Sequence, residues 1–180
     1  MQNWTAVTFL KMNTRFITAI FLSMFFGLLM VPASAQDWAT YESEAFDIQF
    51  DIPEGCETEI EDDMLTATGE GIVFVLTAVK DESVSTKKLF DIQVETMNME
   101  AEGEYNEIEL SGGILGVIGS GSGVIDGEVV GVILLAATLD DNNYLVYIFA
   151  DPDAFEKNEA VMVDIITSLA PRFVGVSDPT

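Results

Sequence analysis

The sequence contains no histidine and a single cysteine, Cys56. Without histidine, neither a Ser-His-Asp triad nor a Cys-His pair can form, and zinc lacks its usual nitrogen ligand. One cysteine cannot make an internal disulfide. Glu54 and Glu57 lie close to this thiol in the sequence and should raise its pKa, which disfavours nucleophilic chemistry. We therefore predict a packed, structural role for Cys56, and we predict no catalytic residue elsewhere.

Basic residues are also scarce. Seven Lys and Arg stand against 31 Asp and Glu, which gives a formal net charge of −24. Nucleic-acid binding depends on Lys and Arg that neutralise phosphates, so this composition excludes a nucleic-acid partner. It equally disfavours anionic membrane surfaces. Solubility is the simplest interpretation of the charge, while calcium, a basic partner or saline surroundings remain compatible with it.

The first 35 residues have the three parts of a secretory signal peptide. Lys11 and Arg15 form a positive region, residues 16–31 form an uncharged run, and Ala33-Ser-Ala35 gives a small-x-small cleavage site. The alternative is a membrane anchor, but a spanning helix needs roughly 20 apolar residues and this run is shorter. We predict cleavage after Ala35, export to the periplasm or out of the cell, and no stable membrane insertion afterwards.

Cleavage at this point would leave residues 36–180, a length that suits one domain with a sizeable core. Because Lys11 and Arg15 would be lost and no acid with them, the mature chain would carry a formal net charge of −26. We predict a lead-in at 36–45, a single domain at 46–171 and a flexible tail at 172–180.

Hydrophobic alternation predicts a sheet of hairpin-linked strands. Residues 46–52 alternate strictly, with Phe46, Ile48, Phe50 and Ile52 on one face. Asp126-Gly127, between two apolar stretches, is a strong signal for a two-residue hairpin. We predict strands at 46–52, 58–60, 64–68, 72–79, 105–110, 114–118, 129–139 and 144–150, the last two joined by a hairpin at 140–143.

Two segments change to helical periodicity. The first is 87–100, with Ser85 or Thr86 as its N-cap. The second follows Asp153 as N-cap, with Glu156 in a capping-box role, and is stopped by Pro171. The predicted buried stripes are Leu89, Phe90, Ile92, Val94 and Met97 in the first helix, and Phe155, Met162, Ile165, Ile166 and Leu169 in the second. The predicted class is α+β: a mostly antiparallel central sheet flanked by two amphipathic helices.

Two segments carry a resemblance to a known family. Residues 46–55, FDIQFDIPEG, form a strand that runs into a Pro-x-Gly turn, and residues 144–169 form a strand, an Asp-Pro step and a helix ending in IITSL. Over residues 46–171 this order resembles the PsbP-like fold, an α/β/α sandwich. Cys56 departs from it, since relatives often carry Trp after the Gly. The resemblance implies a non-catalytic, exported protein that assists a larger complex, and it transfers no functional residue.

Three patterns could bear chemistry, and each has a plainer interpretation. The glycine-rich stretch 119–123 lacks the Lys-Ser/Thr of a phosphate-binding loop, so we predict bulges or tight turns there. Glu107 and Glu109 should face outward roughly 7 Å apart along one strand, a spacing compatible with carboxylate-pair hydrolysis but typical of solvated residues. Acidic clusters at 57–63, 100–109 and 140–143 lack the spacing of a calcium loop.

Among these clusters, the best set of calcium ligand types is Asp140, Asp141, Asn142 and Asn143. A hairpin turn demands the same residue types, so these four are weak candidates only. We expect no other metal ligand and no cofactor.

These observations leave four hypotheses of different classes. The leading one is an exported, non-catalytic domain that binds or helps assemble another envelope or secreted protein, through an exposed sheet edge or an acidic face. The alternatives are an acidic module that binds calcium or is stabilised by it, or a small-ligand-binding protein. A hydrolase that uses paired carboxylates is the fourth.

Overall fold

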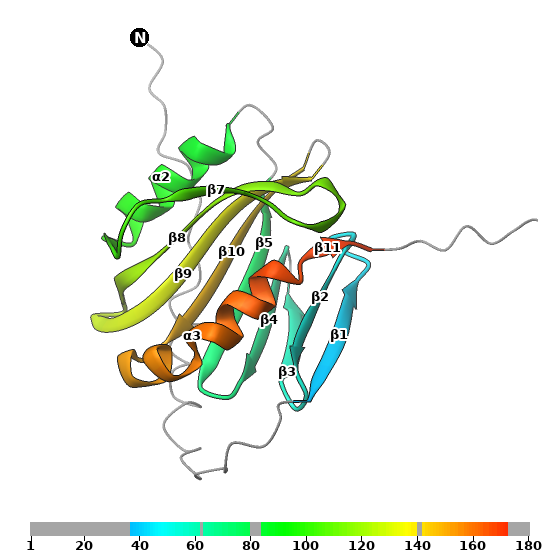
Figure 1. The fold of residues 1–180 in the computed structure, drawn as a ribbon, viewed down its shortest axis with the longest axis horizontal. Coiled ribbons are helices and arrows are strands. Elements are labelled where there is room, and N and C mark those ends of the chain that lie inside the picture. Colours follow the sequence, from blue (N-terminus) through cyan, green and yellow to red (C-terminus); the bar gives the residue numbers. More distant parts are fainter. Residues whose placement is uncertain (1–36, 62, 80–83, 140–141, 173–180) are drawn as a thin grey trace, which may run out of the picture.

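The computed structural model describes residues 37–61, 63–79, 84–139 and 142–172 (Figure 1). The predicted signal peptide, Asp140 and Asp141, and residues 173–180 of the predicted tail lie outside this described part. Within it, no helix is long and apolar enough to cross a membrane.

An eight-stranded antiparallel sheet forms the centre of the molecule, as the hairpin signals predict. Its strand order is β3-β4-β5-β10-β9-β8-β6, and β7 also pairs with β8. The strands are β3 (Glu57–Glu61), β4 (Met64–Gly69), β5 (Ile72–Val79), β6 (Glu100–Ala101), β7 (Asn106–Glu109), β8 (Leu115–Ile125), β9 (Glu128–Leu139) and β10 (Asn142–Ala150). A single 3₁₀ turn, η1 (Ser111–Gly113), joins β7 to β8.

A second, three-stranded sheet joins the two ends of the domain in the order β1-β2-β11. Its strands are β1 (Trp38–Ser43), β2 (Ile48–Pro53) and β11 (Ala170–Pro171). The lead-in predicted at 36–45 therefore contains a strand, which the sequence analysis missed. The strand predicted from Phe46 begins at Ile48 instead, because Asp47 has a positive φ of 57° in the turn before it. Phe46 is nevertheless buried.

Both predicted helices are present, with changed ends. Ser85 caps α2 (Thr86–Thr96) as predicted, since its Oγ accepts a hydrogen bond from the backbone N–H of Lys88. The predicted N-cap of α3 (Pro152–Thr167) is wrong: Asp151 is the cap, and its Oδ1 accepts from Ala154 N at 2.9 Å. Proline fits the first turn of a helix because its missing N–H is not needed there. Glu156 is consequently too far along for the predicted capping box.

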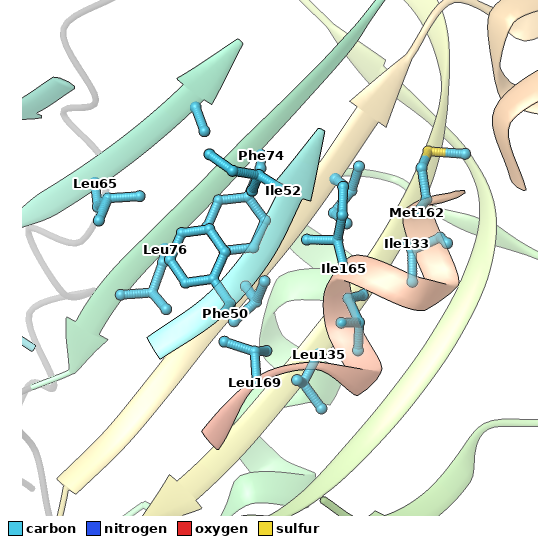
Figure 2. Packing of buried hydrophobic residues seen from close by; sticks show 14 of the residues in the cluster. Phe50, Ile52, Leu65, Phe74, Leu76, Ile133, Leu135, Met162, Ile165 and Leu169 are labelled. Carbon is cyan, nitrogen blue, oxygen red and sulfur yellow. The ribbon is translucent and has the colours of Figure 1, made fainter. Parts of the chain in front are cut away.

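The two helices lie on opposite faces of the large sheet. Along β9, Ile133 and Leu135 belong to a core cluster that includes α3 and β2, whereas Val132 and Leu134 belong to one that includes α2. Figure 2 shows the first cluster, where Phe50 of β2 stacks on Phe74 of β5 with ring centroids 4.5 Å apart. The layers are thus α2, then the eight-stranded sheet, then α3 together with the three-stranded sheet.

Two polar contacts, one buried and one partly buried, attach α2 and the segment before it to β10. Tyr147 of β10 donates its hydroxyl hydrogen to Gln93 Oε1 of α2 at 3.0 Å, and both side chains are buried. Asn143 Nδ2 donates to the carbonyl of Val84, just before α2, at 3.0 Å. Burial raises the pKa of the Tyr147 hydroxyl above its ordinary value.

One residue of the predicted buried stripe of α2 is not buried: Ile92 is 41% exposed.

The glycine-rich stretch 119–123 is neither a bulge nor a turn. It lies inside β8, in continuous register with β9. Two of its glycines have close neighbours: a Cβ at Gly121 would overlap the carbonyl of Glu100 in β6, and one at Gly119 would crowd Phe90 and Tyr105. Small residues in this strand therefore let β6 and α2 approach the sheet.

Candidate interaction surface at the β3 edge

The strand β3 forms one edge of the large sheet, and all five of its residues are exposed. Within the described part of the chain it pairs only with β4, in the register Glu57↔Thr68 to Glu61↔Met64. The backbone N–H and C=O groups on its outer side are therefore available to another chain, as at any free sheet edge. Figure 1 shows β3 at the border of the sheet, on the side of β1 and β2.

The side chains of β3 separate into two kinds by face, because alternate residues of a strand point to opposite sides. Glu57, Glu59 and Glu61 lie on the α2 side of the sheet. Thr58 and Ile60 lie on the other side, opposite Ala67 and Leu65 of β4. Leu65 and Ala67 are buried in the α3-side core, but the side chain of Ile60 is 44% exposed. The β3 edge thus carries carboxylates on one face and an uncovered apolar side chain on the other.

The sequence around β3 carries only negative charge. Between residues 36 and 79 the sequence has twelve acidic residues and no Lys or Arg. Within the described chain, a base enters this region from the C-terminus: Arg172 Nη1 lies 3.1 Å from Glu44 Oε1, and its Nε lies 3.5 Å from Asp47 Oδ1. Its backbone N–H also donates to the carbonyl of Asp47, so Arg172 is not part of a loose tail as predicted.

The strand β7, at the opposite edge of the sheet, has the same tripeptide as β3. Glu107, Ile108 and Glu109 of β7 match Glu-Ile-Glu at 59–61 of β3. Both glutamates of β7 are exposed, as predicted, but Ile108 is half-buried and packs against the α3-side core. Because both carboxylates are exposed, the arrangement has the features of a solvated strand face.

The side-chain amide of Asn143 makes structural hydrogen bonds within the domain. Its Oδ1 accepts from Thr138 Oγ1 at 2.6 Å and its Nδ2 donates to Val84 O. Asn143 is buried, whereas Asn142 is exposed. Asp140 and Asp141 lie outside the described residues. In the part of the chain that the structure describes, no group of three or more His, Cys, Asp or Glu side chains is placed to hold a metal ion.

Cys56 lies in the turn between β2 and β3 and is partly buried against the α3-side core. Burial, and secondarily the carboxylate of Glu70, raise the pKa of its thiol. The direction agrees with the sequence prediction, although the carboxylate responsible belongs to Glu70 rather than to Glu54 or Glu57. A thiol held protonated in this way is a weak nucleophile.

Sequence reasoning had indicated a sheet edge or an acidic face as the interaction surface, without a particular residue. The signal for β3 was its composition, a short strand with one large apolar residue among glutamates. What the sequence could not give is the strand order, which places β3 at the border and leaves Ile60 uncovered.

Comparison with known proteins supports the fold. No protein-family model and no curated protein matches the chain. The solution structure of cyanobacterial PsbP (CyanoP) from Synechocystis sp. PCC 6803 is similar, with a TM-score of 0.56 and 9% identity over 80% of this chain and 97% of that one. A Bacteroides thetaiotaomicron VPI-5482 protein has a TM-score of 0.52 and 11% identity, over 78% of this chain and 50% of that one.

A further solved structure, LpqN of Mycobacterium tuberculosis, described as involved in cell envelope biogenesis, has a TM-score of 0.48 and 12% identity over 77% of this chain and 86% of that one. At identities this low, such likenesses concern the fold alone. The chain has a PsbP-like α+β fold, as the resemblance of residues 46–171 predicted.

Proposed function

We propose that this chain is an exported, non-catalytic domain that binds another secreted or envelope protein through the edge strand β3. The observation that carries the proposal is the exposed side chain of Ile60 in an unpaired edge strand. Large apolar side chains that stay uncovered next to free backbone groups favour association with another chain.

Two further observations support it. The leader at residues 1–35 has the pattern of a secretory signal peptide, which would place the domain among envelope or secreted proteins. The resemblance to the PsbP-like fold implies proteins that assist larger complexes rather than enzymes. A non-catalytic role also agrees with a sequence that has no histidine.

The test is recovery of a partner from the source cell. The full chain would be expressed with a C-terminal tag, crosslinked in living cells and purified from the envelope and from the medium. The informative variant is E57Q/E59Q/E61Q, which removes the charge of β3. The matched control is E102Q/E107Q/E109Q, which removes three exposed carboxylates near the opposite edge.

We expect one stoichiometric partner with the wild-type chain and with the control variant, and its loss with the β3 variant. A partner retained equally by all three chains would contradict a role for β3. No specific partner from either fraction would contradict the binding function itself.

A further inference from the structure

We infer that the bound segment of the partner is an extended strand with alternating basic and apolar side chains, which adds to β3 as a new outermost strand. This rests on the proposed function and specifies the chemistry of its ligand.

The backbone of β3 is suited to strand addition. Its five residues lie in regular register with β4, without proline, over a length that is ordinary for a strand. Every residue is exposed, so no described element covers the outer side. In strand addition, main-chain hydrogen bonds supply affinity, and alternate side chains supply specificity.

The α2-side face of β3 selects for positive charge. An added strand places its side chains about 5 Å from those of its neighbour on the same face. Glu57, Glu59 and Glu61 would therefore each meet a partner side chain, and Lys or Arg at alternate positions would oppose each carboxylate. The absence of any Lys or Arg from residues 36–79 means that the neighbouring sequence does not supply that charge.

The other face selects for apolar side chains. Ile60 lies opposite Leu65, which is fully buried, so the apolar surface of the core continues outward to the edge and stops at an uncovered side chain. A partner strand with valine, isoleucine or leucine at the intervening positions would extend this surface by one strand and remove Ile60 from water.

A second copy of the chain does not fit this surface. Pairing β3 with β3 of another molecule would bring two rows of glutamates onto the same face, and like charges directly opposite each other destabilise a strand pair. The acidic residues thus protect the edge against self-association while leaving it open to a basic strand.

The test measures binding of fluorescent peptides to the purified, processed protein by anisotropy, over a range of salt concentrations. The first peptide alternates Lys and Val over nine residues. The second has the same composition with its lysines and valines in separate blocks. The third has the alternating sequence with its central amides N-methylated, so that charge is kept and the main-chain N–H donors are lost on both edges.

We expect the alternating peptide to bind at least about tenfold more tightly than either control peptide, which corresponds to roughly 1.4 kcal/mol. The variant E57Q/E59Q/E61Q should lose about tenfold in affinity and most of the salt dependence, whereas E102Q/E107Q/E109Q should change little. Ile60→Ala should weaken binding a few-fold at every salt concentration, because its contribution is apolar.

Equal binding of the blocked or N-methylated peptide would overturn the inference, because it would show charge attraction without strand addition. If the cell partner depends on β3 but no peptide binds, strand addition is wrong and the proposed function stands. If the alternating peptide binds in the expected manner but no cell partner is found, the surface has the inferred chemistry and the proposed function fails.

Discussion

The two borders of the large sheet carry the same Glu-Ile-Glu sequence with different outcomes. At β7, Ile108 is packed against the core beneath the sheet; at β3, Ile60 remains 44% exposed. The glutamates can guard both borders against self-pairing, so charge does not distinguish them. The distinguishing feature is whether the isoleucine between the charges is already covered by the chain itself. The β7 border is covered at its isoleucine, and the β3 border is open there.

The largest expected loss of stability comes from substitutions at two glycines, each of which lies against the segment at one border of the sheet. In Gly121→Ala the new methyl group would overlap the backbone of Glu100 in β6, so the strands must separate. In Gly69→Ala it would mainly meet the Cys56 side chain, with Sγ 2.6 Å from the ideal Cβ position. We expect the Gly121 variant to lose about 2–3 kcal/mol of unfolding free energy in urea and the Gly69 variant about 1 kcal/mol. Equal losses would mean that the β6 border is no more tightly closed than the β3 border.

The two isoleucines should differ next. Ile108→Ala removes partly buried methyl groups and should cost about 1–2 kcal/mol, because the core beneath loses contacts. Ile60→Ala acts on an exposed side chain and should change unfolding free energy by less than about 0.5 kcal/mol. Urea denaturation of the two variants measures both. A comparable loss at Ile60 would show that it is already covered and would contradict the open border.

A smaller effect concerns the face of the sheet that α2 covers. Burial raises the pKa of Tyr147 above that of an unfolded tyrosine, about 10, so this stabilising contribution is complete below pH 10 and is lost as the pH rises further. We expect the wild-type chain to lose up to about 1.4 kcal/mol per pH unit above pH 10 through this group. Tyr147→Phe should cost about 1 kcal/mol at neutral pH, because Gln93 loses its hydrogen bond.

The measurement is urea unfolding of both chains at pH 8, 10 and 11. The alkaline loss should be smaller in Tyr147→Phe than in the wild-type chain. Identical slopes would show that the pKa of Tyr147 is the same in the folded and the unfolded chain, which would contradict the predicted effect of its burial.

The smallest expected effect is that of calcium. A chain this acidic should gain thermal stability from any salt, because screening reduces repulsion among its carboxylates. We expect calcium chloride and sodium chloride at equal ionic strength to raise the melting temperature by similar amounts. A much larger rise with calcium would indicate a site, and Asp140→Asn and Asp141→Asn would then test the hairpin candidates.

Local sequence patterns correctly predicted which strand residues are buried and where one tight turn lies. The four alternating residues Phe46, Ile48, Phe50 and Ile52 are all buried, and Asp126-Gly127 forms the expected hairpin with φ of 52° and 87°. These outcomes depend on side-chain period and on turn residues that tolerate positive φ.

The features that the sequence did not predict depend on the pairing of strands that lie far apart in the chain. The strand β1 has only one buried residue, Ser43, so its sequence has little alternation, and it exists because β2 offers an edge. Likewise, Pro171 was predicted only to stop a helix, yet it pairs with Ile48. The exposure of Ile60 has the same origin, since it follows from strand order. The candidate surface was therefore predictable as a class of feature, a sheet edge, and not as a residue.

The pairing of β2 with β11 has a consequence for the time at which the domain can close. Ser168 Oγ accepts from the backbone N–H of Asp51, 117 residues earlier, and Arg172 contacts Glu44, 128 residues earlier. The small sheet cannot be completed until nearly the whole chain has been synthesised. If the chain is exported, this late closure would keep the precursor incompletely folded while a translocation channel takes it up in extended form.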